Sequence, residues 1–280
     1  MIQLSSQAKA ATEPLNGEKA LDSNRVRDRL DAGVICYGTY IRFPGPAPIE
    51  IAAQAGFEFV RIDAYHVAFD PQTLDDMIRA AHAHQVTPWI RCRNDAYEIT
   101  KVLDMGAHAI SAPNVGTVRE AQALVSAVRF APKGQRESSR PVRYHGMGLA
   151  EYVEWAEREI LVSCQIEGAE GLENYKDIVK VEGLDVIQTG RNDIALALGL
   201  PGQQFHKDVL DAEARIVDAA LTAGKQVSLA HPLNEDGIER SLRWAEKGVR
   251  ILTMGSDIDS LFLAFKSGVR QLRSGQTRSL

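Results

Sequence analysis

Short apolar runs alternate with polar stretches along most of this chain. The runs are continuous in apolar residues rather than alternating, which is typical of parallel strands that are covered on both faces. Eight such runs follow one another, and each predicts a strand. They are Gly33–Tyr40, Phe57–Ile62, Val86–Ile90, Ala107–Ala112, Ile160–Ile166, Leu184–Gln188, Gln226–Leu229 and Val249–Thr253.

Between these runs, apolar residues recur at the spacing of a helix that buries one face. The clearest stripes are Leu74-Met77-Ile78-Ala81, Ile99-Val102-Leu103, Ala121-Leu124-Val125-Val128, Ala212-Ile216-Ala219-Ala220 and Ile238-Leu242-Ala245. Eight strand–helix units within about 250 residues fit a (β/α)8 barrel. The alternative, a doubly wound open sheet, normally has a glycine-rich phosphate turn after its first strand, and residues 39–45 (TYIRFPG) lack it. We therefore predict an α/β fold, a single-domain (β/α)8 TIM barrel over residues 25–280.

Two segments do not follow this alternation of predicted strands and helices. Residues 1–24 are polar and lack sustained periodicity, which predicts a flexible N-terminal arm or a strap on a neighbouring subunit. Residues 132–148 carry Lys133, Arg136, Arg140 and Arg143 and are too polar and too rich in Gly and Pro for a helix. A connection of this length is either a solvated excursion or a lid or subunit contact that attracts an anion. The sequence leaves both interpretations open.

The net charge limits the classes of partner that we expect this chain to bind. The chain of 280 residues has 32 Lys+Arg and 37 Asp+Glu and a formal net charge of −5. Nucleic-acid and membrane-surface binding both need a concentrated positive field, so we expect neither partner. No apolar run approaches the roughly 20 residues that span a bilayer, and we see no secretory signal. Three widely spaced cysteines fit a reducing compartment, so we expect a cytoplasmic location.

Acidic residues follow two neighbouring predicted strands. Glu167 ends the fifth run, and Asp193 comes shortly after the sixth. Reactive groups of such barrels sit at the C-terminal ends of strands, and neighbouring strands lie ~4.8 Å apart. Two carboxylates placed there repel each other unless a cation lies between them, and two oxygen ligands favour Mg²⁺ or Mn²⁺ over structural Zn²⁺. The alternative is that each acid independently forms a salt bridge or caps a helix.

Three further side chains follow the second and third runs. Asp63 and His66 form a candidate acid–imidazole pair, in which the carboxylate orients the ring and raises its basicity. Arg91 places a guanidinium in the barrel mouth, where an anion or an acidic neighbour such as Asp63 or Asp95 stabilises it. A small anionic keto acid fits between these groups and the cation. No lysine ends a strand run, which argues against Schiff-base chemistry.

Several segments resemble one known family. They are Ala55–His66, Val102–Val115, Arg129–Arg136, Gln165–Leu172 and Val181–Gly202. Over about residues 33–270 the chain resembles the HpcH/HpaI family of metal-dependent (class II) pyruvate aldolases, related to macrophomate synthase and the 2-keto-3-deoxy sugar acid aldolases. The last two segments are the most specific, because they contain both acids at the family's separation.

The resemblance implies a role for each candidate residue. A divalent metal, Mg²⁺ or Mn²⁺ with Co²⁺ as a further candidate, would bind Glu167 and Asp193. Arg91 would stabilise the enolate, and His66, oriented by Asp63, would serve as acid and base.

The resemblance also implies where substrate binds and how subunits associate. Gln165 would lie near the pyruvate unit, and backbone amides at Gly190, Arg191 and Asn192 would hold the substrate carboxylate. The implied reaction cleaves a 4-hydroxy-2-oxo acid to pyruvate and an aldehyde through a metal-bound enolate. A homo-oligomer, either a trimer or a hexamer, is expected, with the C-terminal helix exchanged with or packed on a neighbouring subunit.

Five residues at three sites depart from the family's pattern. Ala64-Tyr65 stand where the family usually has Gly-Glu, Arg191-Asn192 where it has Pro-Ala, and Glu137 where it has Gly. Tyr65 removes a carboxylate next to the candidate catalytic imidazole. Three alternatives therefore stay open: oxaloacetate decarboxylation at the same site, enolate condensation there, or a barrel that binds a metabolite without catalysis.

Overall fold

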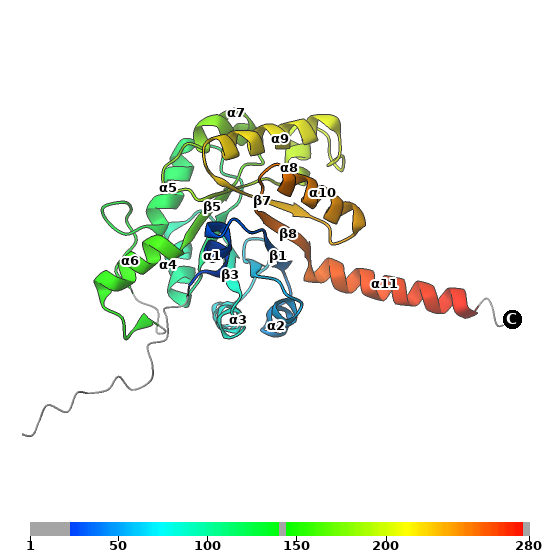
Figure 1. Ribbon diagram of the computed structural model, residues 1–280, viewed down its shortest axis with the longest axis horizontal. Coiled ribbons are helices and arrows are strands. Elements are labelled where there is room, and N and C mark those ends of the chain that lie inside the picture. The colour runs from blue at the N-terminus through cyan, green and yellow to red at the C-terminus, as the bar shows by residue number, and fades with distance from the viewer. Residues whose placement is uncertain (1–22, 140–143, 277–280) are drawn as a thin grey trace, which may run out of the picture.

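The strands form one closed parallel barrel in the computed structural model, which describes residues 23–139 and 144–276 (Figure 1). The strand order follows the sequence, and β8 closes the barrel against β1. The prediction of a (β/α)8 TIM barrel is thereby confirmed. The strands are β1 (Cys36–Ile41), β2 (Phe59–Asp63), β3 (Thr87–Arg91), β4 (Ala109–Ala112), β5 (Leu161–Gln165), β6 (Val186–Gln188), β7 (Gln226–His231) and β8 (Ile251–Ser256).

Helices surround the barrel, and most begin or end at residues that satisfy their free backbone groups. Asp70 accepts hydrogen bonds from two backbone N–H groups of α3, and Thr117 with Glu120 forms a capping box on α5. Gly106 ends α4 with a φ of 108°, which favours glycine. The helices are α1 (Arg25–Asp31), α2 (Ala47–Gln54), α3 (Pro71–Ala83), α4 (Ala96–Met105), α5 (Val118–Val128), α6 (Leu149–Glu159), α7 (Ala169–Ile178), α8 (Arg191–Ala197), α9 (Lys207–Thr222), α10 (Glu235–Glu246) and α11 (Asp257–Gln276). Within the described ranges, every helix is too short or too polar to cross a membrane.

The barrel interior is closed at the end where the strands begin. Val26 of α1 packs there with Phe59, Trp89 and residues from the starts of other strands. Asn24 is also buried, and its amide donates to the backbone oxygens of His108 (2.9 Å) and Glu159 (2.8 Å). Residues 1–22 of the predicted arm lie outside the described residues. The opposite end of the barrel is thus the only end that side chains leave open in the described chain.

A buried arginine lies above this apolar plug. Arg61 of β2 is fully buried, and its guanidinium carbon lies 4.4 Å from the centre of the Trp89 ring. One guanidinium nitrogen donates to the Ser228 hydroxyl at 3.0 Å. Burial lowers the pKa of Arg61, and contact with aromatic faces offsets part of the cost of holding a cation there. The sequence showed Arg61 within the second strand run but did not indicate that its side chain is buried inside the barrel.

The irregular segment at residues 132–148 is partly tied to the barrel. Arg136 is buried, and it pairs with Asp104 at 3.2 Å and donates to the Tyr152 hydroxyl at 2.9 Å. Lys133 pairs with Glu157 at 3.1 Å. Arg136 is therefore held inside the chain, whereas the Lys133–Glu157 ion pair lies at the surface. Arg140 and Arg143 lie outside the described residues.

The last helix, α11, does not pack along the outside of the barrel of its own chain. Figure 1 shows α11, in red, extending away from the barrel, and its apolar residues Phe262, Phe265 and Leu272 are largely exposed. A groove of about 280 Å³ remains beside α10, lined by Ile238, Leu242 and residues of β1, β8 and the turn after α2. Of the apolar stripe predicted on α10, only Ala245 is buried. Ile238 and Leu242 are exposed, because no described helix of this chain covers them.

We predict that Gly38→Ala destabilises the barrel. An added Cβ would lie 2.3 Å from the ring of Phe59, which is fully buried. Overpacking of this kind lowers the free energy of unfolding by about 1–3 kcal/mol, measurable by urea denaturation. Gly146→Ala is the matched control, because its added Cβ meets no atom within 4 Å. Equal midpoints for the two variants would contradict the prediction.

Candidate active site

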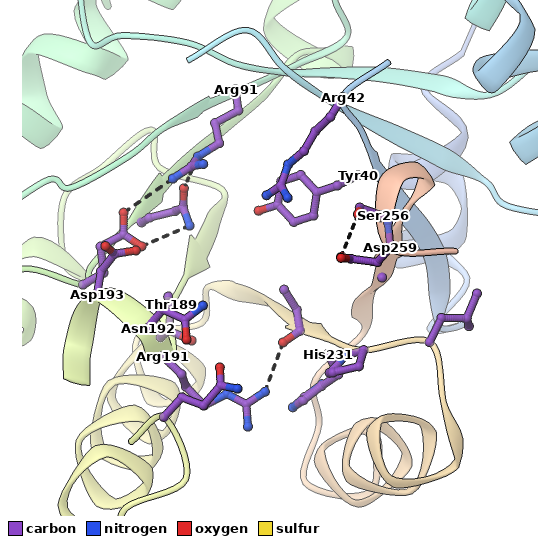
Figure 2. Close-up of a pocket in the computed structure, with 18 of the residues that line it drawn as sticks. Tyr40, Arg42, Arg91, Thr189, Arg191, Asn192, Asp193, His231, Ser256 and Asp259 are labelled. Atoms are coloured by element: carbon purple, nitrogen blue, oxygen red, sulfur yellow. Dashed lines mark hydrogen bonds and ion pairs between the residues drawn. The ribbon is translucent and has the colours of Figure 1, made fainter. Parts of the chain in front are cut away.

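A cavity of about 560 Å³ opens at the C-terminal ends of the strands (Figure 2). Its walls come from the ends of β1, β3, β5, β6, β7 and β8 and from the first turns of α8 and α11. Arg91, Gln165, Glu167, Gly190, Arg191, Asn192 and Asp193 all line it. Most side chains singled out from the sequence therefore converge on one space.

The two predicted metal-binding carboxylates face the same point. Glu167 follows β5, and Asp193 lies in the first turn of α8. A Cβ on Gly190 would lie 2.0 Å from Glu167 Oε2 and 3.4 Å from Asp193 Oδ2. Any residue with a side chain at position 190 would therefore collide with Glu167. The glycine leaves the space in which both carboxylates reach the cavity.

Arg91 and Gln165 both contact the Glu167 carboxylate. Arg91 Nε donates to Gln165 Oε1 at 2.6 Å, and Gln165 Nε2 donates to Glu167 Oε2 at 3.2 Å. A second Arg91 nitrogen lies 3.8 Å from Glu167 Oε1. All three side chains are buried, so this chain of contacts fixes the orientation of each group relative to the others.

Glu167 is electrostatically strained. The pKa of its carboxyl is raised to about 7: burial is the main cause and the charge of Asp193 adds to it, while Arg91 opposes both effects. The Asn114 N–H donates to Glu167 at 3.2 Å and also favours the ionised form. A cation placed beside the two carboxylates would relieve this strain, because opposite charge favours the ionised state.

Asp63 lies beneath the cavity and pairs with two arginines. It is fully buried, with one carboxylate oxygen 3.3 Å from Arg42 Nε and 3.6 Å from Arg91 Nη1. Its other oxygen accepts the backbone N–H of His66 at 3.2 Å. The sequence predicted a contact with the His66 ring, whereas in the structure the carboxylate holds the His66 backbone. Asp63 therefore orients Arg91 and the turn that carries His66.

The His66 ring itself is exposed and lies outside the lining of the cavity. It packs edge-on against the ring of Tyr65, with centroids 4.9 Å apart. The Tyr65 ring in turn lies 5.5 Å from the Arg91 guanidinium carbon. Tyr65, at the position where the resemblance departs from its family, thus connects His66 to the arginine at the mouth.

Sequence reasoning missed Arg42. This residue follows β1 in the segment that was considered only for a phosphate-binding turn. Its guanidinium lines the cavity and shares the Asp63 carboxylate with Arg91. The usable signal was its position directly after the first strand run, which is the criterion that singled out the other candidates.

A second polar cluster lines the wall farther from Arg91. Arg191 Nε lies 3.7 Å from Glu213 Oε1, and Arg191 Nη2 donates to the Ala230 oxygen at 3.3 Å. Glu213 of α9 also accepts the Thr189 hydroxyl at 2.9 Å. Burial raises the pKa of Glu213, and Arg191 opposes that shift. The Arg191 side chain thus points toward Glu213 and β7, while Asn192 beside it lines the cavity.

His231, at the end of β7, completes this wall and was also missed. Burial, together with the charges of Arg191 and Arg240, lowers the pKa of His231 to about 3. The ring is therefore neutral at physiological pH. Its position two residues after the seventh apolar run was the available signal, whereas Glu213 lies within a helical stripe that gave none.

A closed parallel barrel with charged side chains at the C-terminal ends of its strands has the architecture of TIM-barrel enzymes. The sequence profile described as HpcH/HpaI aldolase/citrate lyase matches residues 37–263. The chain therefore belongs to the HpcH/HpaI aldolase/citrate lyase family. The predicted family and the prediction of an aldolase-type lyase are both confirmed.

Relatives with named activities span nearly the whole chain. The hydroxypyruvate/pyruvate aldolase of Delftia acidovorans is 28% identical over 91% of this chain and 95% of its own length. The 5-keto-4-deoxy-D-glucarate aldolase of Escherichia coli is 30% identical over 89% and 95%. Among solved structures, the citrate synthase SbnG matches with a TM-score of 0.82 and 30% identity, covering 91% of this chain and 99% of that one. Macrophomate synthase has the same fold, with a TM-score of 0.83 at 21% identity over 98% of this chain and 100% of its own.

We predict that His231 makes the protein less stable in mild acid. The low pKa of this ring means that at pH 5 only the unfolded chain takes up its proton, which costs the folded state about 2 kcal/mol relative to pH 8. Urea unfolding at both pH values measures the loss. His231→Gln should lose about 2 kcal/mol less over this range, and His84→Gln, at an exposed position, is the control. The same pH dependence in wild type and His231→Gln would refute the assignment.

Proposed function

We propose that this chain is a divalent-metal-dependent (class II) aldolase that cleaves a 4-hydroxy-2-oxo acid to pyruvate and an aldehyde. The observation that carries the proposal is the convergence of Glu167 and Asp193 on the space left by Gly190, beside the Arg91–Gln165 pair. The named aldolases that align along most of the chain support the same reaction class.

The donor set fits a hard cation. Both side chains offer carboxylate oxygens, and both reach the open cavity, which leaves positions for water and for substrate oxygens. Within the described ranges no third His, Cys, Asp or Glu joins them. Glu167 and Asp193 would hold Mg²⁺, Mn²⁺ or Co²⁺. A bound cation supplies a Lewis acid that polarises the 2-keto group.

Arg91 would stabilise the enolate oxygen that gains charge as the C3–C4 bond breaks. Its guanidinium is already fixed by Gln165 and Asp63, so no reorganisation is needed when the charge develops. The Gln165 amide, in contact with both Arg91 and Glu167, would contact the pyruvate unit. The backbone amides of residues 190–192 would bind the substrate carboxylate.

The remaining step is removal of the proton from the 4-hydroxyl group, which the family resemblance assigns to His66. The His66 ring lies outside the cavity lining in this structure, so it would have to turn toward the cavity to take this proton. Asp63 acts here as a positioning residue, because it holds the His66 backbone and the Arg91 side chain together. Once the proton has left, the C3–C4 electron pair moves toward C3, and the C4 carbon departs as the aldehyde carbonyl.

A second candidate is condensation rather than cleavage, because a structure named as a citrate synthase is 30% identical to this chain. The same enolate of pyruvate or oxaloacetate would then attack an acceptor without release of an aldehyde. Product analysis with pyruvate plus aldehydes, compared with oxaloacetate alone, separates cleavage, condensation and decarboxylation.

Metal removal should abolish turnover. We expect chelator-treated protein to recover activity with Mg²⁺, Mn²⁺ or Co²⁺, and Glu167→Gln to lose Mn²⁺ binding and about 10²–10³ of the rate together. Calorimetric titration with Mn²⁺ and single-turnover cleavage measure the two effects. Glu170→Gln, on the exposed side of α7, is the control and should keep both. Full turnover in excess chelator would refute the metal role.

We propose further that the subunits associate through α11. Its exposed apolar residues and the apolar groove beside α10 are complementary surfaces that one copy does not bring together. Packing of α11 on a neighbouring copy would supply the missing eighth helix of that barrel and give the expected trimer or hexamer. Large exposed apolar patches of this kind mark interaction surfaces.

Charge placed on the apolar face of α11 should break the assembly. We expect the double substitution Phe265→Asp with Leu272→Asp to lower the mass in light scattering from that of an oligomer to that of a monomer, since each aspartate would be desolvated on packing. Gln271→Asp, on the same helix, is the matched control. A wild-type monomer, or an oligomer that survives the double substitution, would overturn this proposal.

A further inference from the structure

The buried guanidinium of Arg61 has an unusual set of partners. Both of its polar contacts within the described chain are hydroxyl groups rather than carboxylates: it donates to Tyr40 at 3.4 Å and to Ser228 at 3.0 Å. Its Nε has no partner among the described residues. A buried cation without a neighbouring anion is costly, and a perturbed group beside a cavity is a candidate for a role in the chemistry of that cavity.

Tyr40 connects this cation to the cavity. It lies near the end of β1 and lines the cavity, as does Arg42 two residues later. Figure 2 shows its ring projecting into the cavity, with the hydroxyl oxygen directed toward the side that carries Arg91 and Asp193. The guanidinium carbons of Arg61 and Arg42 lie 5.3 and 5.5 Å from the centre of the ring. The phenol therefore has one cation inside the barrel and another at the mouth.

The contact between Arg61 and Tyr40 fixes what the hydroxyl group offers. A guanidinium can only donate, so the Tyr40 oxygen accepts from Arg61 and keeps its own hydrogen free. No side chain in the described part of the chain accepts that hydrogen, which is therefore available to a group in the cavity. The same guanidinium stabilises negative charge on the oxygen after the hydrogen has left, without reorganisation.

The pKa of Arg61 reflects the same pairing. Burial lowers it, and the interaction with Tyr40 is the largest effect in the opposite direction. Negative charge on Tyr40 would thus stabilise the buried guanidinium, just as the guanidinium would stabilise that charge. The two groups depend on each other electrically although Tyr40 is only partly buried.

The location of Tyr40 contrasts with that of His66. The His66 ring lies outside the cavity lining, whereas the Tyr40 hydroxyl is on a residue that lines it. A group that moves a proton must come within hydrogen-bond reach of the reacting oxygen. Of these two residues, only Tyr40 can contact a molecule in the cavity without a rearrangement of the chain.

We propose that Tyr40 exchanges a proton with the 4-oxygen of the substrate, and that Arg61 acts through Tyr40 as a positioning residue. This inference rests on the proposed aldolase function, and it assigns the proton-transfer step of that function to Tyr40 in place of His66.

The step is balanced in both directions. In cleavage, the ionised Tyr40 oxygen takes the proton of the 4-hydroxyl group. The O–H electron pair becomes the second C4–O bond, the C3–C4 bond breaks, and its electrons pass to the pyruvate enolate. A proton from water then completes the methyl group of pyruvate, and Tyr40 returns its proton to water. In synthesis, the neutral Tyr40 donates its proton to the aldehyde oxygen.

The test compares single variants of the metal-loaded enzyme. The substrates are 4-hydroxy-2-oxopentanoate and 4,5-dihydroxy-2-oxopentanoate, and the one that the wild type cleaves faster is used throughout. Tyr40→Phe removes only the hydroxyl, so we expect kcat to fall about 10²-fold or more with little change in KM. Calorimetric titration should show unchanged Mn²⁺ binding. Tyr97→Phe, at an exposed position on α4, is the matched control and should keep the wild-type kcat.

A double-mutant cycle tests the part played by Arg61. Arg61→Met removes the charge but keeps an unbranched apolar side chain inside the barrel. We expect it to lower kcat by about 10- to 100-fold in the wild-type background, the value of a hydrogen bond to a charged group. In the Tyr40→Phe background it should cost little more, because its effect passes through the hydroxyl that is already absent. Equal losses in both backgrounds would show that Arg61 acts only on the structure of the barrel.

The outcomes separate this inference from the proposed function. If the wild-type enzyme cleaves neither substrate, the aldolase function fails and this inference fails with it. If the wild type cleaves one but Tyr40→Phe loses less than about 10-fold in kcat, Tyr40 does not move the proton. The same conclusion follows if Tyr40→Phe loses Mn²⁺ binding, or if His66→Gln loses as much activity as Tyr40→Phe or more. The comparison of Tyr40→Phe with His66→Gln decides the matter if Arg61→Met does not fold.

Discussion

The arrangement of the mouth depends on two like charges held close together. Glu167 and Asp193 approach one another because Gly190 has no side chain, and burial makes their repulsion stronger than it would be in water. Arg91 relieves part of that repulsion, and its own position is set by Gln165 on one side and Asp63 on the other. Removing one of the charged groups would leave a buried charge without its partner, so the position of each charged side chain depends on the others.

The barrel was predictable because its strands are buried on both faces. Continuous apolar runs then mark each strand, and the eight observed strands all overlap the predicted runs. Position after a strand run was also sufficient to place Arg91, Glu167 and Asp193 at the cavity, because strand ends of a closed barrel meet at one mouth. Gln165, which also lines the cavity, was singled out by the family resemblance. The boundaries were less reliable: β7 and β8 continue to His231 and Ser256, beyond the apolar residues that defined the runs.

The features that could not be predicted from the sequence depend on contacts between segments that are far apart in the chain. The pairing of Asp63 with Arg91 was one of the expected alternatives, but its second partner, Arg42, and the outward turn of the His66 ring were not. Glu213 lies on a helix whose pattern indicates only an amphipathic surface, so its place in the cavity wall follows from how α9 packs on the barrel. The apolar residues of α10 were expected in the core of this chain, yet Ile238 and Leu242 face a groove that α11 leaves uncovered.

The way the chain enters the barrel has a practical consequence. Asn24 and α1 seal the end where the strands begin, so the described chain starts on the side of the molecule away from the cavity. A fusion partner, affinity tag or solid support joined directly to Ser23 would thus lie at the sealed end of the barrel. Protein immobilised in this way would keep the cavity facing the solution. Attachment at the other terminus would instead place the support next to α11.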